Sequence, residues 1–330
     1  MAKPVVAFTD VDDLDPEPGV RLLADAGFEV RVVRSRDPDV IAASAAGAVA
    51  LVVGYARIDA KLLDRLPSLR ILATMSAGYD MVDTAAACER GLWVTHLPDS
   101  ATEDVAAHAL ASALALVRGL AHADAAVRSG GWSADFRELP RRTGELTLGL
   151  VGMGRIARVL ARYAAPLFGR VAAHDPRASA SGWPEGVDRL GLDALLESSD
   201  VLSLHCPLTE DTHGLVDGAL LSRMRPGSWL VNVSRGELVE PHALLDALDS
   251  GRLSGAALDV FPVEPPEARD PLRTHPRLLL SPHSAFRSGA SLRAYAVKPA
   301  ENILAWHRTG APLTPVVTPA PGARAEGATL

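Results

Sequence analysis

Cysteine is almost absent from this sequence, and so are long apolar runs. The chain of 330 residues has only Cys88 and Cys206, which lie far apart and form no CxxC pair. They indicate neither a disulfide framework nor a zinc site, so we expect two reduced thiols. No run of about 18 apolar residues occurs that would span a membrane. The N-terminal stretch MAKPVVAFTD lacks the apolar segment and cleavage site of a signal peptide, so we expect a cytoplasmic protein with no membrane partner.

Basic clusters and metal-binding patterns are missing too. The net charge of −7, without a Lys/Arg-rich run, argues against nucleic acid as the main partner. The acidic stretch DVDDLDPEPG lacks the glycine and the terminal glutamate of a calcium-binding loop. His96, His108 and His122 have no metal-ligand spacing, and we interpret them as surface or interdomain residues. We therefore expect a small-molecule ligand and no metal.

Short apolar segments alternate with helix-like segments along most of the chain, from VVAF near the start to RLLLSP near residue 280. Such alternation is typical of doubly wound parallel sheets in α/β proteins. A chain of this length with 48% hydrophobic residues can bury two cores. Residues 101–127 are rich in Ala and Leu and contain no proline, which predicts one long helix. RAYAVKPAENILAWH predicts a helix that completes the first domain, before a tail rich in Pro, Ala and Gly.

The segment GLVGMGRIA places glycines between a predicted strand and a predicted helix. Gly152 would allow a tight turn, Gly154 the approach of a pyrophosphate, and Ala157 close packing of helix on strand. Asp175 follows 175 − 154 = 21 residues later, at the end of the next predicted strand, where an acidic residue binds ribose hydroxyls. The combination predicts a dinucleotide site that favours NAD, because a carboxylate repels the 2′-phosphate of NADP. The alternative for Asp175 is a turn residue before proline.

Three later strand ends carry charged or titratable side chains: Arg235 in VNVSRGELVE, Glu264 in ALDVFPVEPP and His283 in LLLSPHSAF. In open α/β sheets, ligands bind at this carboxyl edge of the strands. A guanidinium can bind a carboxylate through two parallel hydrogen bonds and polarise the adjacent carbonyl. An imidazole can exchange a proton with a carbonyl oxygen near neutral pH, and a nearby carboxylate would hold its tautomer. Taken singly, these residues also fit a surface ion pair, a loop acid and a helix start.

In this order, the glycine motif, HCPLTEDTHGLV, VNVSRGELVE, GAALDVFPVEPP and SPHSAF closely resemble the D-isomer-specific 2-hydroxyacid dehydrogenases over nearly the whole chain. The resemblance implies an NAD-dependent oxidoreductase that transfers hydride between NAD(H) and a 2-keto acid or D-2-hydroxy acid. It implies that Arg235 binds the substrate carboxylate and that His283 and Glu264 form an acid/base pair. The cofactor-binding residues implied by motif are Gly152, Gly154, Arg155, Ile156, Asp175, His205, Cys206, Pro207, Thr212, Ser234 and Asp259.

MSAGYDMVD resembles the family's loop whose backbone N–H groups bind the substrate carboxylate, which places Ala77 and Gly78 in the cleft. Further substrate contacts are expected, by position, from Tyr55, Arg57, Met75, Ser76, Phe286 and Arg287. Tyr55, Met75 and Phe286 would form an apolar wall that favours a medium or aromatic side chain, so we expect a substrate larger than pyruvate. Arg57 and Arg287 would be placed to bind a second anionic group.

We expect two doubly wound parallel-sheet α/β domains with a cleft between them. Residues 1–98 would form a flavodoxin-like substrate-binding domain, completed by a C-terminal helix at residues 287–310. Residues 99–286 would form a Rossmann NAD-binding domain, and residues 311–330 a flexible tail. Members of the family usually pair through the cofactor domain, so the resemblance also implies a homodimer.

Two alternatives to this enzyme stay open. PHSAF replaces the commoner P-H-x-G and resembles the branch that contains the C-terminal-binding proteins, which include transcriptional corepressors. In that reading the chain is an NAD(H)-sensing binding protein, whose partners recognise a cofactor-dependent conformation. The other alternative is a phosphite-type dehydrogenase on the same fold. The set Arg235, Glu264 and His283 favours the hydroxyacid enzyme, because a sensor needs only the dinucleotide site.

Overall fold

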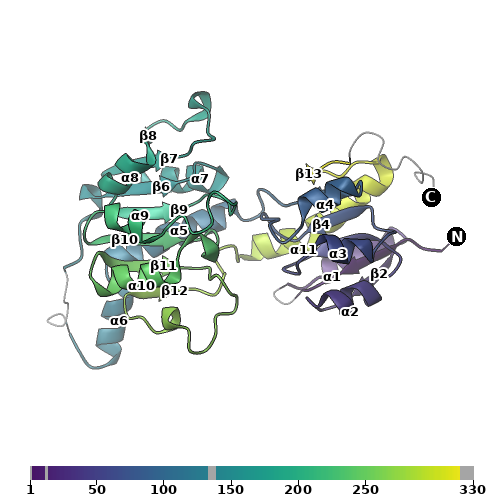
Figure 1. Cartoon of the computed structure of the whole chain (residues 1–330), viewed down its shortest axis with the longest axis horizontal. Helices are drawn as coiled ribbons and strands as arrows, with labels where there is room; N and C mark the ends of the chain where they lie inside the picture. Colours follow the sequence, from purple (N-terminus) through teal and green to yellow (C-terminus); the bar gives the residue numbers. More distant parts are fainter. Residues whose placement is uncertain (1, 12–13, 133–138, 320–330) are drawn as a thin grey trace. The chain divides into compact units, whose positions relative to one another are not determined.

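The computed structural model describes residues 2–11, 14–132 and 139–319 of the chain. It divides into two compact units, each with its own sheet and helices (Figure 1). The first consists of Met1–Ala101 with Arg287–Leu330, and the second of Thr102–Phe286. The predicted fold class, two doubly wound α/β units built on parallel strands, is confirmed. The assignment of substrate binding to the first unit stays a prediction.

The first unit contains a six-stranded sheet in the order β13-β5-β4-β3-β1-β2. The order β2-β1-β3-β4-β5 is flavodoxin-like and reverses between β1 and β3. These five parallel strands are β1 (Val5–Phe8), β2 (Glu29–Val32), β3 (Ala48–Val53), β4 (Ile71–Thr74) and β5 (Trp93–Thr95). The helices between them are α1 (Glu17–Asp25), α2 (Pro38–Ser44), α3 (Ala60–Asp64) and α4 (Thr84–Glu89).

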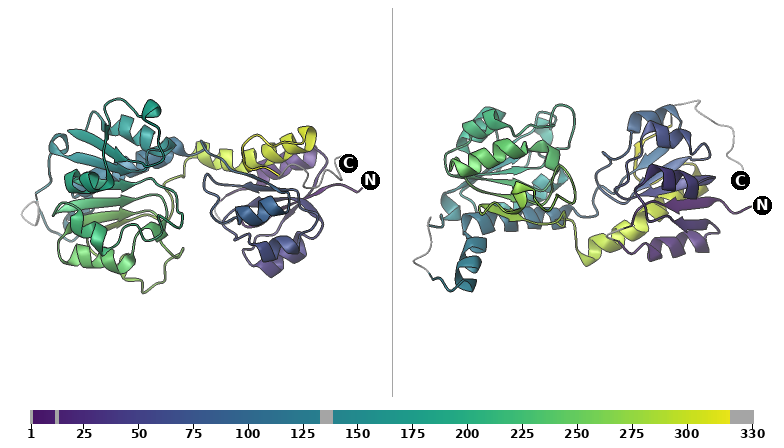
Figure 2. Two further views of the ribbon diagram at one scale, coloured as in Figure 1. Left: turned by 45° about the horizontal axis from the view of Figure 1, so that its top comes forward. Right: turned by 60° about the horizontal axis from the view of Figure 1, so that its bottom comes forward.

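Burial on both faces explains why the strands of the first unit read as apolar runs rather than as alternating patterns. Val6, Ala7 and Phe8 are fully buried, with Val6 and Phe8 in one core and Ala7 in another. The C-terminal helix α11 (Gly289–Thr309) packs beside α1 over β3 and β4 (Figure 2). The C-terminal segment of the sequence therefore helps to cover a sheet formed by the N-terminal segment.

The second unit contains seven parallel strands in the order β12-β11-β10-β9-β6-β7-β8. This is a Rossmann order extended by one strand, and it reverses between β6 and β9. The strands are β6 (Thr147–Val151), β7 (Arg170–His174), β8 (Asp188–Arg189), β9 (Val201–Leu204), β10 (Ser228–Asn232), β11 (Leu253–Leu258) and β12 (Leu278–Leu280). One core packs against α8 (Leu192–Ser198), α9 (Gly218–Arg223) and α10 (Pro241–Asp249), and the other against α5 (Thr102–Val117) and α7 (Arg155–Ala164). Short 3-10 turns are η2 (Thr143–Glu145), η3 (Ala180–Gly182), η4 (Gly236–Leu238) and η5 (Pro271–Arg273).

The prediction of one long helix over residues 101–127 is wrong. Helix α5 ends at Val117, α6 (Leu120–Arg128) begins after Gly119, and the two helices are bent by 61°. The reason is Gly119, whose φ of 62° is left-handed and interrupts the helical path. Among the described residues no single helix is long and apolar enough to cross a membrane, and only the bent pair α5 and α6 passes that test together.

The prediction of a flexible tail at residues 311–330 is wrong for the part that forms β13 (Pro315–Val317). This strand pairs antiparallel with β5 at the edge of the first sheet. The segment before it is anchored on α11, where Asn302 Oδ1 accepts hydrogen bonds from the N–H groups of Leu313 (3.0 Å) and Thr314 (2.9 Å). The remainder of the predicted tail, from residue 320 onward, lies outside the described residues.

Candidate active site

The predicted cofactor and catalytic residues of the second unit follow the ends of its parallel strands. The carboxyl ends of parallel strands meet at one edge of a sheet, so these residues are brought to a common edge. The candidates and their strands are Gly152 after β6, Asp175 after β7, His205 after β9, Ser234 and Arg235 after β10, Asp259 after β11 and His283 after β12.

The two glycines of the loop after β6 are needed for different reasons. Gly152 has a φ of +96°, and a Cβ there would lie 2.6 Å from the carbonyl oxygen of His205. The chain itself therefore requires glycine at this position. A Cβ on Gly154 would meet no protein atom within 4 Å. The space beside Gly154 is therefore open to a ligand. The packing of the protein itself does not require glycine at this position.

Helix α7 begins directly after Gly154, which provides no side-chain cap. The N–H groups of a first helical turn have no partner within the helix, and they favour an anion together with the helix dipole. Arg155 and Ile156 occupy this turn. Ala157 is fully buried against the sheet, which explains why a small residue is needed there. The loop and helix together form a site that fits a pyrophosphate.

Asp175 is bound to the glycine loop as well as to its own turn. Its Oδ2 accepts from the N–H of Met153 (2.8 Å), and its Oδ1 accepts from the N–H groups of Arg177 (2.8 Å) and Ala178 (3.1 Å). Burial alone would raise the pKa of Asp175, but these three donors and His174 outweigh it, so the pKa lies below its ordinary value. Asp175 is therefore ionised at neutral pH. The sequence did not reveal its bond to the glycine loop.

His205 and Cys206, after β9, are both uncharged near neutral pH. His205 Nε2 bonds to Ser203 Oγ (2.8 Å), and burial lowers the pKa of His205 to about 4. Its Nδ1 is buried without a hydrogen-bond partner among the described residues, which is unusual for a buried nitrogen. Burial, with a smaller contribution from Asp175, raises the pKa of Cys206 to about 11. The loop after β9 therefore contributes no charge from His205 or Cys206 at neutral pH.

The loops after β9 and β10 are fixed by side-chain hydroxyls. Thr212 Oγ1 donates to the carbonyl of Pro207 (2.7 Å) and accepts from the N–H of Thr209 (2.8 Å). Ser234 Oγ donates to the carbonyl of Leu204 (2.8 Å) and so links the two strand ends. Each of these predicted cofactor residues thus has a structural bond of its own, and their contacts with the cofactor stay predictions.

Arg235 lies on a loop that only glycine allows to pack closely. A Cβ on Gly236 would lie 1.9 Å from the carbonyl carbon of Phe261 and 2.2 Å from the nitrogen of Pro262. The Arg235 guanidinium donates to the carbonyl of Ser234 (2.8 Å) through Nη1. The R-G motif therefore presses the arginine loop against the loop that carries Glu264.

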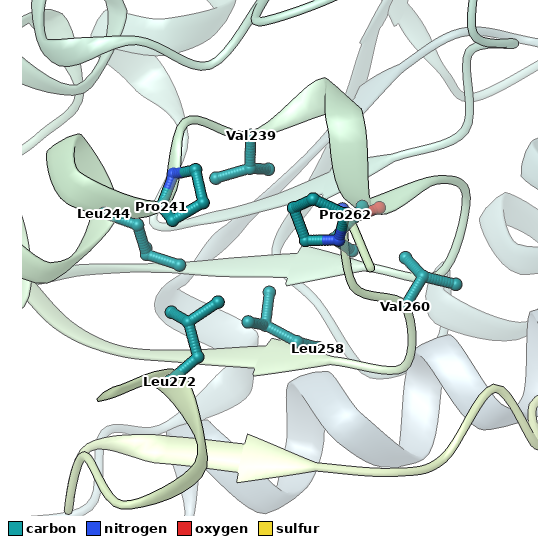
Figure 3. Close-up of a pocket in the computed structure, with 9 residues that line it drawn as sticks. Val239, Pro241, Leu244, Leu258, Val260, Pro262 and Leu272 are labelled. Carbon is teal, nitrogen blue, oxygen red and sulfur yellow. The ribbon is translucent and has the colours of Figure 1, made fainter. Parts of the chain in front are cut away.

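A small cavity lies behind this contact, between the loops and α10. Its volume is about 10 Å³, and apolar side chains form most of its wall (Figure 3). Such a volume is at the lower limit for a single water molecule. It is a packing gap rather than a substrate pocket. The lining residues are Asn232, Gly236, Val239, Pro241, Leu244, Leu258, Val260, Pro262 and Leu272.

His283 and Glu264 form the acid/base pair that the sequence pattern predicts. His283 Nδ1 lies 2.6 Å from Glu264 Oε2, and the two side chains are 29% and 30% exposed. The other oxygen, Oε1, accepts from the N–H of Phe261 (2.9 Å). Because a carboxylate only accepts hydrogen bonds, Nδ1 carries a proton, and Nε2 is the ring nitrogen through which the imidazole can exchange a proton.

Asp259 holds the turn that carries His283. The turn needs support because His283 has a left-handed φ of 49°. The buried Asp259 carboxylate accepts from the hydroxyl of Ser281 (2.6 Å) and from the N–H groups of Ser284 (2.9 Å) and Ala285 (2.9 Å). Its carbonyl accepts from the N–H of His283 (2.7 Å). Asp259 was predicted to bind the cofactor, and in the structure it also positions the imidazole.

Two further residues, one in each unit, form hydrogen bonds that no pattern in the sequence indicates. His108 on α5, interpreted above as a surface or interdomain residue, bonds through Nε2 to Ser281 Oγ (3.0 Å). Asp10, in the acidic stretch after β1, is buried and accepts from the N–H groups of Tyr55 (2.6 Å) and Ala56 (3.1 Å). No spacing in the sequence marks either residue, since each partner lies tens of residues away. Among the described residues, no cluster of His, Cys, Asp or Glu could hold a metal ion.

The predicted substrate residues of the first unit follow β3 and β4. Tyr55 has the Arg36 guanidinium 4.7 Å from its ring centroid, and Arg57 is exposed. Met75 is 5% exposed and packs in the core of its own unit, and its place in a substrate wall stays a prediction. Ser76 Oγ donates to the carbonyl of Gly78 (2.6 Å) within the predicted carboxylate-binding loop.

The segment after His283 includes the last two predicted substrate residues. Phe286 belongs to the second unit, and its ring meets the His283 ring edge-on with centroids 6.1 Å apart. Arg287, assigned to the first unit, is exposed. Contacts of these residues with substrate stay predictions.

Comparisons with known proteins agree with this geometry. Residues 110–285 match the family described as D-isomer specific 2-hydroxyacid dehydrogenase, NAD binding domain. A glyoxylate reductase from Korarchaeum cryptofilum is 39% identical over 255 residues, which cover 76% of this chain and 77% of the relative. The chain belongs to the D-isomer-specific 2-hydroxyacid dehydrogenase family.

Two solved structures extend the comparison over nearly the whole chain. An NADPH-dependent glyoxylate/hydroxypyruvate reductase from Sinorhizobium meliloti, in complex with NADP and malonate, is 32% identical with a TM-score of 0.84 and covers 96% of this chain and 97% of that one. A D-lactate dehydrogenase from Aquifex aeolicus, complexed with NAD and lactic acid, is 28% identical with a TM-score of 0.86 and covers 96% and 100%.

As a member of this family, the protein is an oxidoreductase that transfers hydride between a nicotinamide cofactor and 2-keto or D-2-hydroxy acids, with NAD as its cofactor. The family, activity and cofactor expected from the sequence are confirmed. The residues present fit NAD: open space over Gly154, an uncapped helix start, an ionised Asp175 and an unpartnered Nδ1 on His205.

The two glycines should respond differently to substitution by alanine. Gly152→Ala should destabilise folding, because its Cβ would clash with His205 at a left-handed φ, which alone costs about 1–2 kcal/mol. Gly154→Ala should lower folding stability by less than about 1 kcal/mol and weaken NADH binding about tenfold or more, because its Cβ enters the pyrophosphate space. Denaturant unfolding and NADH fluorescence titration measure the two effects. Full NADH affinity in Gly154→Ala would contradict this role, and Gly144→Ala, which also meets no protein atom, is the control.

Proposed function

We propose that this dehydrogenase reduces a small 2-keto acid with NADH, using Arg235 to bind the carboxylate and His283 to protonate the carbonyl oxygen. The observation that carries the proposal is the 2.6 Å hydrogen bond between His283 Nδ1 and Glu264 Oε2. A protein that only senses NAD(H) needs no acid/base pair at the edge of its cofactor domain. The pair therefore favours catalysis over the corepressor-like alternative.

In the proposed reaction, bound NADH supplies the hydride to the carbonyl carbon of the substrate. Arg235 holds the carboxylate and polarises the adjacent carbonyl through its planar guanidinium. His283 Nε2 gives its proton to the oxygen as negative charge develops there. Glu264 fixes the imidazole through Nδ1 and balances its positive charge, and the N–H of Phe261 keeps that carboxylate in place. Oxidation of the D-2-hydroxy acid is the reverse.

A small substrate is supported by the relatives and by Phe286. The Korarchaeum relative is a glyoxylate reductase, and the Sinorhizobium structure is a glyoxylate/hydroxypyruvate reductase. The Phe286 ring, edge-on to His283, narrows the space beside the imidazole. We propose glyoxylate or hydroxypyruvate as the substrate, rather than the larger 2-keto acid that the sequence alone leads us to expect. A second anionic group bound by Arg57 and Arg287 stays a prediction.

Substitutions in the acid/base pair should lower turnover and leave the affinity for NADH unchanged. His283→Ala should lower kcat about 100- to 10,000-fold, since a positioned proton donor contributes about that much, and leave the Kd of NADH within twofold. Glu264→Gln should lower kcat less, because an amide can still accept from Nδ1. NADH oxidation by absorbance against a panel of 2-keto acids measures kcat, with His242→Ala on the exposed face of α10 as the control. Wild-type kcat in His283→Ala would contradict the proposed mechanism.

We propose that Asp175 makes the enzyme prefer NADH over NADPH. Its ionised carboxylate would accept from the ribose hydroxyls and repel a 2′-phosphate. Asp175→Asn keeps an oxygen acceptor for the backbone donors and removes the charge, so it should lower the ratio of kcat/KM for NADH over NADPH about tenfold. Asp175→Ala should in addition weaken the binding of both NADH and NADPH, because the N–H of Met153 loses its hydrogen-bond partner. Equal kcat/KM for NADH and NADPH in the wild type would contradict this role.

We propose that the enzyme works in the cytoplasm as a homodimer. Helix α6 buries none of its residues, and its apolar side chains Leu120 (56%) and Val127 (56%) are exposed. Trp132 (73%) and Leu139 (87%), which follow α6 in the sequence, are exposed too. Such exposure is typical of a surface that a second subunit covers. Both cysteines are free thiols, as expected in a reducing compartment. Light scattering at micromolar concentration should give about twice 34.7 kDa, and a mass of one chain would contradict the dimer.

A further inference from the structure

The C-terminal strand β13 pairs with β5 at the edge of the first sheet, and side chains also hold the segment that enters it. Asn302 on α11 is 2% exposed, and its Oδ1 accepts from the N–H groups of Leu313 and Thr314. Its Nδ2 donates to the carbonyl of Lys298 (3.1 Å). The segment that enters β13 is therefore fixed to α11 before it reaches β5.

Thr314 continues this connection to His96. The Thr314 hydroxyl donates to the carbonyl of His96 (2.5 Å), and the N–H of His96 donates to the carbonyl of Thr314 (3.2 Å). The two residues thus form a reciprocal pair just beyond the carboxyl end of β5. His96 and Thr314 are 218 residues apart in the sequence, so only the fold brings them together.

His96 in turn holds the loop that is proposed to bind the substrate carboxylate. Its Nδ1 lies 3.0 Å from the carbonyl oxygen of Ala77, which only accepts hydrogen bonds, so Nδ1 is protonated. Its ring also meets the Tyr79 ring edge-on, with centroids 5.5 Å apart. The neighbouring N–H of Leu97 donates to the carbonyl of Ser76 (2.9 Å).

These two bonds set the direction of the amides in the loop. In a trans peptide the C=O and the following N–H point in opposite directions. Fixing the Ser76 carbonyl on Leu97 therefore turns the N–H of Ala77 away from β5. Fixing the Ala77 carbonyl on His96 does the same for the N–H of Gly78. Both amides that the proposed function assigns to the substrate carboxylate are thus aligned by bonds within the protein itself, which lowers the cost of binding an anion.

We propose that His96 and Thr314 are positioning residues for the substrate carboxylate, so that the C-terminal strand is part of the substrate site. The inference rests on the proposed function, because it assumes that the amides of Ala77 and Gly78 bind the carboxylate. Neither residue touches the hydride or the transferred proton. Their loss should therefore raise the KM for the 2-keto acid and leave the binding of NADH unchanged.

The test uses paired substitutions in the full chain. His96→Phe keeps a ring beside Tyr79 and removes the Nδ1 donor, whereas His96→Asn places an amide N–H near the same position. Thr314→Val removes the hydroxyl and keeps the shape, whereas Thr314→Ser restores the hydroxyl. Thr318→Val, at an exposed position directly after β13, is the matched control. The measurements are KM and kcat for the 2-keto acid, the Kd of NADH by fluorescence titration, and Tm.

Losing one hydrogen bond of this kind should raise the KM for the 2-keto acid about three- to tenfold in His96→Phe and about two- to threefold in Thr314→Val. The Kd of NADH should stay within twofold, His96→Asn and Thr314→Ser should lie near the wild type, and Thr318→Val should not differ from it. An unchanged KM in active His96→Phe and Thr314→Val overturns this inference alone. The inference is also overturned if all four variants at His96 and Thr314, including His96→Asn and Thr314→Ser, lose NADH affinity and Tm together. A wild type that reduces no 2-keto acid with NADH overturns the proposed function and this inference together.

Discussion

The contact of Gly236 with the Phe261–Pro262 peptide is the constraint on which the proposed catalytic set depends. No side chain fits between these two segments, so the loop after β10 packs backbone to backbone on the loop after β11. Arg235 precedes one side of the contact, and the N–H of Phe261 holds Glu264 on the other. Glu264 then fixes His283, whose strained turn is held by Asp259. One glycine thus positions side chains that come from three different strand ends.

The two units use the same principle for different ligands. In the second unit, the carboxylate of Asp175 binds the N–H of Met153 and so orders the loop that approaches a pyrophosphate. In the first unit, His96 binds the carbonyl of Ala77 and so orders amides proposed to meet a carboxylate. In both cases a side chain bonds to the backbone of a loop that is proposed to bind an anion. These bonds lie within the protein itself, so less of the binding free energy is spent on ordering the loops.

The parts of this account that the sequence could predict are local. Apolar runs buried on both faces mark the strands, and motifs at strand ends mark Arg235, Glu264 and His283, because a parallel sheet brings its strand ends to one edge. The remainder depends on contacts between distant segments. A single glycine, Gly119, bends a stretch whose Ala/Leu composition favours an unbroken helix, and His96 is ordered by a threonine some two hundred residues away. Neither effect leaves a pattern in the sequence.

The most direct test of the central claim is the fate of the transferred hydride. Wild-type enzyme is incubated with hydroxypyruvate and NADH deuterated at both C4 positions, and the glycerate is analysed for configuration and for deuterium at C2. The account predicts D-glycerate that carries deuterium at C2, because the cofactor and the catalytic set act on one face of a carbonyl held by its carboxylate. L-glycerate, or D-glycerate with hydrogen from solvent at C2, would contradict it.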